Sequence, residues 1–212
     1  MDSKPDRLRA EVVDAPNTLR ECYPQPIERV RLKVLRRLDR HCRDFIALSP
    51  FLCIGTTGEN GADVSPRGDR PGFVRVLDDS TLALPDWRGN NRLDSLTNVL
   101  SDSRVGLLFL IPGVDETLRV NGTAEITTGC DLLTSWEADG KRPTSALVIA
   151  VSEVFLHCGK ALIRSRLWHD DYRIERDQLP SYGRMLKDQI DIRDSAEDIE
   201  ASIADAYKNK LY

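Results

Sequence analysis

The sequence predicts an α+β protein, mainly β, built on a small antiparallel barrel with flanking helices. Several short strand-like runs are separated by turns rich in glycine, proline and aspartate. One run, residues 117–126, alternates strictly between apolar and polar side chains, as a strand with one buried face does. A single helical segment interrupts the strands near residues 92–100. A doubly wound sheet would instead place a helix after each strand, so this order favours a barrel.

The first core element is predicted to be a helix that begins at Pro26 and ends before Ser49 and Pro50. Apolar residues recur along it at spacings of four, four and three, namely Val34, Leu38, Cys42 and Phe45. The same stretch carries six arginines between positions 29 and 43. We interpret these arginines as a solvated helix face, with a DNA-binding surface as the alternative.

The remaining elements follow from the same patterns. Strands are predicted at residues 51–57, 62–65, 73–77, 81–84, 104–111, 117–126 and 145–156. The run 104–111 is continuously apolar, which predicts burial on both faces. A small helix near 131–137, a helical turn at 159–168 and two amphipathic C-terminal helices complete the chain. We therefore divide it into an N-terminal arm (1–25), a barrel domain (26–175) and a helical extension (176–212).

Composition excludes several classes of function. Thirty basic and 34 acidic side chains give a net charge of −4, which argues against a nucleic-acid partner. The opening residues are too polar for a signal peptide, and no apolar run is long enough to span a bilayer, so we expect a cytoplasmic protein. The five cysteines and three histidines show no metal-ligand spacing, so no metal site is predicted.

The segment 84–96 is the strongest candidate for binding an anion. A strand ends, a glycine-containing loop turns, and a helix is predicted to begin at Asn91 or Arg92. The free backbone amides at a helix N-terminus suit a phosphate, and Arg92 and Ser95 would add hydrogen bonds. The alternative is a purely structural capping box made by Asn91 and Asp94.

Two further clusters have polar or cationic side chains on one face. Arg119 and Asn121 are same-face neighbours on the best-defined strand. Lys160, Arg164 and Trp168 recur at helical spacing. Each cluster is consistent either with a ligand contact or with an ordinary exposed face.

Together, these segments resemble the pyridoxamine 5'-phosphate oxidase-like FMN-binding proteins, and among them a subgroup described as FMN-dependent. The resemblance covers roughly residues 26–190. It is carried by the runs DVSPRGD (63–69), GFVRVL (72–77), LPD (84–86), GNNRLDSL (89–96), VGLLFL (105–110), LRVNG (118–122) and HCGKALIRSRLW (157–168). These motifs are specific as a set, although no single one identifies the family.

The resemblance implies a six-stranded antiparallel split barrel that forms a homodimer with two FMN sites at the subunit interface. It assigns Ser65 and Arg67 to the isoalloxazine ring and ribityl chain. It places the backbone of Leu84, Pro85 and Asp86 along the flavin, and Asn90, Asn91, Arg92 and Ser95 at the phosphate. Arg119 and Asn121 match a strand that serves the site of the opposite subunit, and Lys160, Arg164 and Trp168 match a segment that closes over the cofactor.

The function implied is that of an FMN-dependent oxidoreductase acting on an unidentified small molecule. We expect Arg119 to stabilise the ring edge that becomes anionic on reduction, and we name no catalytic acid or base. The true oxidases carry a C-terminal basic motif of the Arg-x-His type for the substrate phosphate, which this sequence lacks, so we do not expect vitamin B6 oxidation. The alternative is a protein that binds, stores or senses a flavin, the deazaflavin F420 or haem without turnover.

Overall fold

A computed structural model describes residues 12–59, 61–138, 140–209 and 211–212. The chain separates into two compact units, one ending at Val34 and the other spanning Leu35–Tyr212. The described part of the first unit contains two short helices, α2 (Pro16–Glu21) and α3 (Glu28–Leu32). Neither helix contains a buried residue, so neither contributes a core of its own.

The long helix predicted from Pro26 is wrong, because the chain leaves the helical conformation between α3 and α4 (Arg40–Leu48). Leu35 forms two backbone hydrogen bonds with Val154, each 2.9 Å long, and this pairing takes the amide and carbonyl that a helix would use. Helix α4 then starts at Arg40, and the carboxylate of its N-cap residue Asp39 accepts a hydrogen bond from the Cys42 amide at 2.8 Å.

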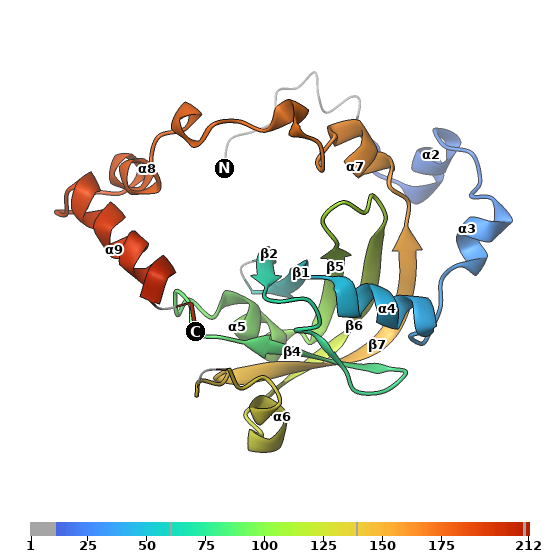
Figure 1. Ribbon diagram of the computed structural model, residues 1–212. Coiled ribbons are helices and arrows are strands. Elements are labelled where there is room, and N and C mark those ends of the chain that lie inside the picture. The colour runs from blue at the N-terminus through green and yellow to red at the C-terminus, as the bar shows by residue number, and fades with distance from the viewer. Residues whose placement is uncertain (1–11, 60, 139, 210) are drawn as a thin grey trace. The chain divides into compact units, whose positions relative to one another are not determined.

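The second unit is organised around one antiparallel sheet (Figure 1). Its strands are β1 (Phe51–Gly58), β2 (Gly61–Gly68), β3 (Arg75–Val76), β4 (Thr81–Asp86), β5 (Arg104–Leu110), β6 (Thr117–Thr127) and β7 (Ser145–His157). Their order is β2-β1-β5-β6-β7-β4-β3, and every neighbouring pair is antiparallel. The predicted α+β class is confirmed. The seven strands correspond to the seven runs predicted from the sequence, and the predicted strand at 73–77 is the two-residue β3. The count of six implied by the resemblance is wrong, because β3 pairs with β4 and makes a seventh.

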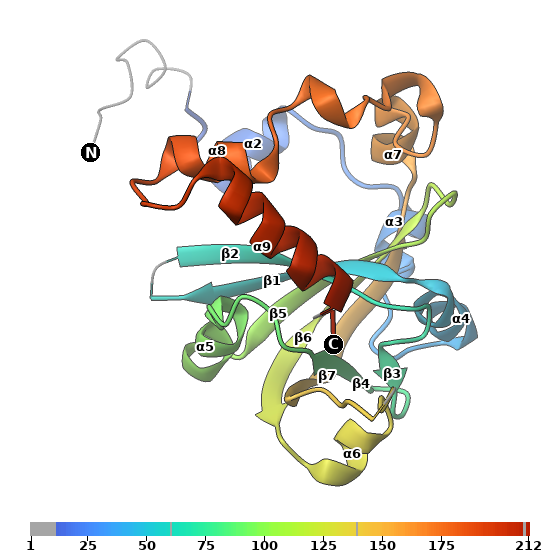
Figure 2. The same cartoon turned by 60° about the vertical axis from the view of Figure 1, so that its left-hand side comes forward.

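The sheet curves strongly around its core. Four strands separate β2 from β4 in the sheet order, yet the Arg67 Nη2 atom on β2 lies 3.9 Å from the Asp86 Oδ1 atom on β4. In Figure 2, β1 and β2 run across the view whereas β6 and β7 run steeply, so the strand direction changes along the sheet. Inward side chains of five strands and of two helices join one apolar cluster, which includes Ile46, Leu52, Ile54, Leu82, Val99, Leu107, Phe109, Leu118, Val120, Leu147 and Ile149.

Alternating burial sets the two faces of the central strands. On β6 the predicted alternation is confirmed: Leu118 and Val120 are buried, whereas Arg119 is exposed. On β5 the prediction of burial on both faces is wrong, because Phe109 is fully buried while its neighbour Leu108 is 36% exposed. A continuous apolar run therefore does not reveal the face of β5 that lies outside the core.

Helix α4 and the helix between β4 and β5 contact the sheet, whereas the two C-terminal helices contact each other. Helix α5 (Asp94–Ser101) contacts β1, β2 and β6, and α6 (Cys130–Thr134) follows β6, so both helices predicted between strands are present. After α7 (Lys160–Ser165), helices α8 (Tyr182–Gln189) and α9 (Ala196–Asn209) pack against each other. Among the described residues, no helix has the length and apolar character needed to cross a membrane.

Candidate functional site

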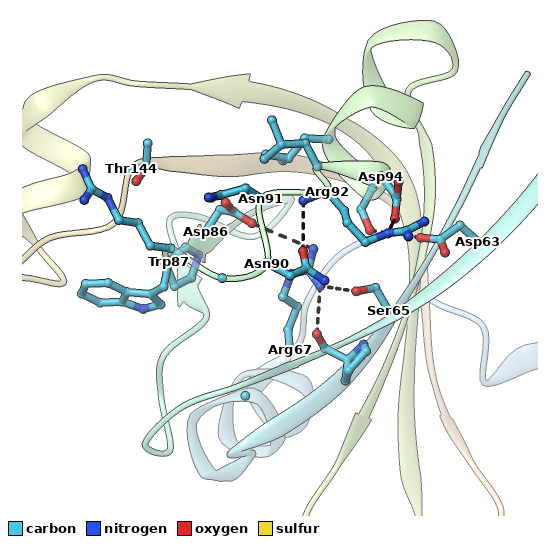
Figure 3. Close-up of a pocket in the computed structure, with 18 of the residues that line it drawn as sticks. Asp63, Ser65, Arg67, Asp86, Trp87, Asn90, Asn91, Arg92, Asp94 and Thr144 are labelled. Carbon is cyan, nitrogen blue, oxygen red and sulfur yellow. Dashed lines mark hydrogen bonds and ion pairs between the residues drawn. The ribbon is translucent and has the colours of Figure 1, made fainter. Parts of the chain in front are cut away.

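A cavity of about 470 Å³ lies between β2, the end of β4, the loop after β4 and the first turn of α5 (Figure 3). Its volume falls within the range of small-molecule and cofactor sites, roughly 300–1,000 Å³. Because β2 and β4 meet here only through the curvature of the sheet, segments distant in the sequence contribute to one wall.

Strand β2 contributes a row of polar side chains. Asp63, Ser65 and Arg67 alternate with exposed residues and line the cavity, as the period of two in a strand requires. The Nη1 atom of Arg67 donates hydrogen bonds to the Ser65 hydroxyl and to the backbone oxygen of Pro66, the latter at 2.8 Å. The guanidinium is therefore held in one orientation, with its second terminal nitrogen directed to Asp86.

Strand β4 ends at the cavity with Pro85 and Asp86. The backbone oxygen of Asp86 accepts a hydrogen bond from the Thr144 amide at 3.0 Å, which fixes the end of the strand beside β7. Burial raises the pKa of the Asp86 carboxyl above its usual range, and the nearby Arg67 partly opposes that increase. The cavity therefore contains a carboxylate that is poorly compensated in its charged form.

The loop after β4 adopts unusual backbone conformations before α5 begins. Asn91 and Leu93 have φ angles of 57° and 59°, in the left-handed region that non-glycine residues seldom occupy. The helix therefore begins at Asp94, and the predicted start at Asn91 or Arg92 is wrong. No capping box forms either, because Leu93 stands at the cap position and supplies no side-chain hydrogen bond to the first turn.

Hydrogen bonds hold the polar side chains of this loop and helix. The Asn90 side-chain oxygen Oδ1 accepts a hydrogen bond from the Arg92 backbone amide at 3.0 Å, and Arg92 Nε donates to the Asp94 carboxylate at 2.7 Å. The buried Ser95 hydroxyl lies 3.3 Å from the Asp63 carboxylate. The positive charge of Arg92 partly offsets the negative charge of Asp94. The repulsion between Asp94 and an anion bound at the uncapped end of α5 is therefore reduced.

Charges of both signs line the cavity. Its cations are Arg67, Arg88 and Arg92, and its carboxylates are Asp63, Asp86 and Asp94. Arg88 is exposed and makes no hydrogen bond or ion pair with any residue that the structure describes. This arrangement suits a ligand with an anionic group near the loop and with neutral donors and acceptors near β4. Among all the residues that the structure describes, no cluster of three or more His, Cys, Asp or Glu side chains could hold a metal ion.

The cavity gathers many of the residues that the sequence indicated. Those lining it are Ser65, Arg67, Pro85, Asp86, Asn90, Asn91, Arg92 and Ser95. Leu84 does not line it, because its side chain points into the core and is 1% exposed. Leu84 directly precedes Pro85 on β4, and successive side chains of a strand point to opposite faces, so Leu84 points away from the cavity that Pro85 lines.

The other predicted residues lie elsewhere in this chain. The Arg119 guanidinium is 5.1 Å from the centre of the Phe155 ring, and Asn121 donates a 2.7 Å hydrogen bond to Glu153, both on the outer side of β6 and β7. Lys160 and Arg164 are exposed on α7, and Trp168 donates through Nε1 to the backbone oxygen of Val114 at 2.9 Å. None of these side chains lines the described cavity.

Some cavity residues were not predicted to bind a ligand. Asp63 was missed although it precedes Ser65 and Arg67 by two and four positions, a spacing that places all three on one strand face. Thr144 had no signal in the sequence, because only the pairing of β7 with β4 brings it to the cavity. Trp87 also lines the wall, with its ring edge-on to Tyr212 at 4.8 Å.

The sequence of this chain matches the profile of one protein family. The profile of the family described as pyridoxamine 5'-phosphate oxidase matches residues 38–158, which is more than half of the chain. No curated protein matches the sequence.

Solved structures also resemble the chain. HupZ from Group A Streptococcus is 19% identical, with a TM-score of 0.46 over 56% of this chain and 93% of HupZ. A Clostridium acetobutylicum protein of the pyridoxinephosphate oxidase family, related to general stress protein 26, is 16% identical, with a TM-score of 0.43 over 56% of this chain and 86% of its own. Because the family profile spans the whole sheet and the helices between its strands, the chain belongs to the pyridoxamine 5'-phosphate oxidase family.

Proposed function

We propose that this protein binds FMN in the described cavity and acts as an FMN-dependent oxidoreductase on a small molecule. The observation that carries the proposal is the convergence of β2, the end of β4 and the first turn of α5 on one cavity of about 470 Å³. The volume, the three arginines and the uncapped helix end all fit a ligand that combines a ring system with a phosphate.

The chain's own residues would bind and orient the cofactor. The phosphate would lie at the loop and α5, near Asn90, Arg92 and Ser95, where backbone amides and a guanidinium supply donors. The ring would lie toward β2 and β4. Bound FMN supplies the redox chemistry by accepting or donating a hydride, while the protein supplies position and hydrogen bonds.

The homodimer and the cytoplasmic location are parts of the same proposal. Arg119 and Asn121 lie on the outer side of the sheet, where they are available to a second copy of the chain. Exposed apolar side chains nearby, including Leu108 and Leu156, support an interface on this side. In such a dimer, α7 with Lys160, Arg164 and Trp168 would approach the partner's cofactor.

A second candidate function is flavin storage or sensing without turnover. Trp87 favours it, because an aromatic ring in the wall of the cavity can cover one face of a bound ring system. Adding NADH or NADPH to the flavin-loaded protein distinguishes the two, since an oxidoreductase that accepts these donors would lose its flavin absorbance near about 450 nm.

The first experiment is an absorption spectrum of the purified full chain, repeated after FMN is added and the sample is desalted. We expect flavin bands near about 370 and 450 nm to remain with the protein. A folded protein that releases all added FMN would contradict the assignment.

Replacing Arg92 with alanine should weaken FMN binding by about 1.5–3 kcal/mol, the range for hydrogen bonds to charged groups. Arg92 is largely exposed and its ion pair with Asp94 contributes little to folding, so the fold should be unchanged. Isothermal titration with FMN measures the effect. Arg104→Ala is the matched control, because Arg104 pairs with Asp102 in a similar exposed arrangement outside the cavity. Equal FMN affinity of the two variants would remove Arg92 from the phosphate site.

A further inference from the structure

Two oppositely charged side chains face each other across the inner part of the cavity. Arg67 on β2 and Asp86 on β4 are each 21% exposed, and the distance between Nη2 and Oδ1 is 3.9 Å. That separation allows electrostatic attraction but is too long for a hydrogen bond. Figure 3 shows both side chains in the wall of the cavity.

The Asp86 carboxylate lacks the hydrogen bonds that such a position requires. Among the described residues its only side-chain partner is Arg67, at the long distance given above. The two other cavity carboxylates are engaged, Asp63 by the Ser95 hydroxyl and Asp94 by Arg92. A partly desolvated carboxylate is stable only when donors compensate it, and burial accordingly raises the pKa of Asp86. A ligand N–H group would supply the missing donor.

The neighbouring guanidinium supplies the complementary group. Arg67 is fixed through Nη1 by Ser65 and Pro66, which leaves Nη2 on the side of Asp86. An acceptor and a donor therefore stand side by side with fixed spacing. The complementary ligand edge has an N–H beside a carbonyl oxygen, as in a cyclic imide.

Resting on the FMN assignment above, we propose that Arg67 and Asp86 recognise the imide edge of the isoalloxazine ring. Asp86 accepts a hydrogen bond from the ring N3–H, and Arg67 donates to an adjacent ring carbonyl. The pair therefore selects flavins and deazaflavins, which share this edge, over porphyrins, which lack it. It also sets the direction of the ligand, with the ring at β2 and β4 and the phosphate at α5.

The test compares FMN with FMN methylated at N3, a ligand that keeps the phosphate and the ring but lacks the imide proton. Flavin fluorescence titrations of the full chain give both dissociation constants. The wild-type protein should bind FMN at least about tenfold more tightly, as expected for a hydrogen bond to a charged acceptor. Asp86→Ala should bring the ratio close to one.

Asp94→Ala is the matched control, since it removes a cavity carboxylate at the phosphate end. It should change both affinities by the same factor and leave the ratio as in the wild type. Thermal melting of each variant shows whether it is folded before titration.

The outcomes separate this inference from the assignment on which it rests. If the folded wild-type chain binds neither flavin, both proposals are overturned. If it binds FMN and methylated FMN equally, or if Asp86→Ala keeps the wild-type ratio, the flavin site stands and the imide contact to Asp86 is overturned.

Discussion

Phe109→Ala should lower the free energy of unfolding by about 3–5 kcal/mol, which is the usual cost of truncating a fully buried phenylalanine. Phe109 lies in the apolar core on β5 and has no exposed surface. Its removal would leave a cavity lined by side chains of several strands, which the curved sheet cannot easily collapse to fill. Urea denaturation followed by circular dichroism measures the change.

The neighbouring residue provides the control for that result. Leu108 is on the opposite face of the same strand and is 36% exposed. Within a single chain Leu108→Ala removes less apolar contact, so it should cost well under half as much at a protein concentration at which the proposed dimer is dissociated. Equal losses in the two variants would contradict the one-sided core that the structure assigns to β5.

Arg67→Ala should weaken FMN binding by about 1.5–3 kcal/mol, the range for a hydrogen bond made by a charged group. The substitution removes a donor to the ligand and also leaves Asp86 without its counter-charge at 3.9 Å. The second effect acts on the ligand as well, because an uncompensated carboxylate would then lie beside the bound ring. Isothermal titration calorimetry with FMN gives the affinity directly.

Arg88→Ala is the matched comparison, since Arg88 lines the same cavity but is exposed and unpaired among the described residues. Solvent screens its charge, so we expect it to weaken FMN binding by less than about 1 kcal/mol. If Arg88→Ala proved as damaging as Arg67→Ala, the affinity would depend on net positive charge rather than on the fixed position of Arg67.

Local patterns in the sequence were sufficient for most of the strands and for several of the segments that line the cavity. The alternation along residues 117–126 predicted both the strand and its buried face, because period two is a property of the strand itself. The 84–96 segment was recognised as a strand, loop and helix start, although the left-handed Asn91 and Leu93 delayed the helix to Asp94. Left-handed backbone conformations are usually signalled by glycine. Positions 91 and 93 are not glycine, so the sequence does not predict the delay.

Long-range pairing explains where the sequence was insufficient. The apolar residues after Pro26 have the spacing of a helix. No continuous helix forms, because Leu35 uses its backbone groups to pair with Val154, more than a hundred residues away. The apolar run of β5 could not reveal that Leu108 faces away from the core. Both outcomes depend on how the chain packs in three dimensions, and no local pattern contains that information.

The sequence by itself determined the family motifs, the α+β class and the residue types available for binding an anion. Only the tertiary structure decided which of those residues meet. Arg67 and Asp86 face each other because the sheet curves until β2 and β4 approach, although four strands lie between them in its order. The same curvature leaves Arg119 and Asn121 on the outer side, away from the cavity. Curvature arises from strand twist and from the packing of one shared core, which are properties of the whole sheet rather than of any segment.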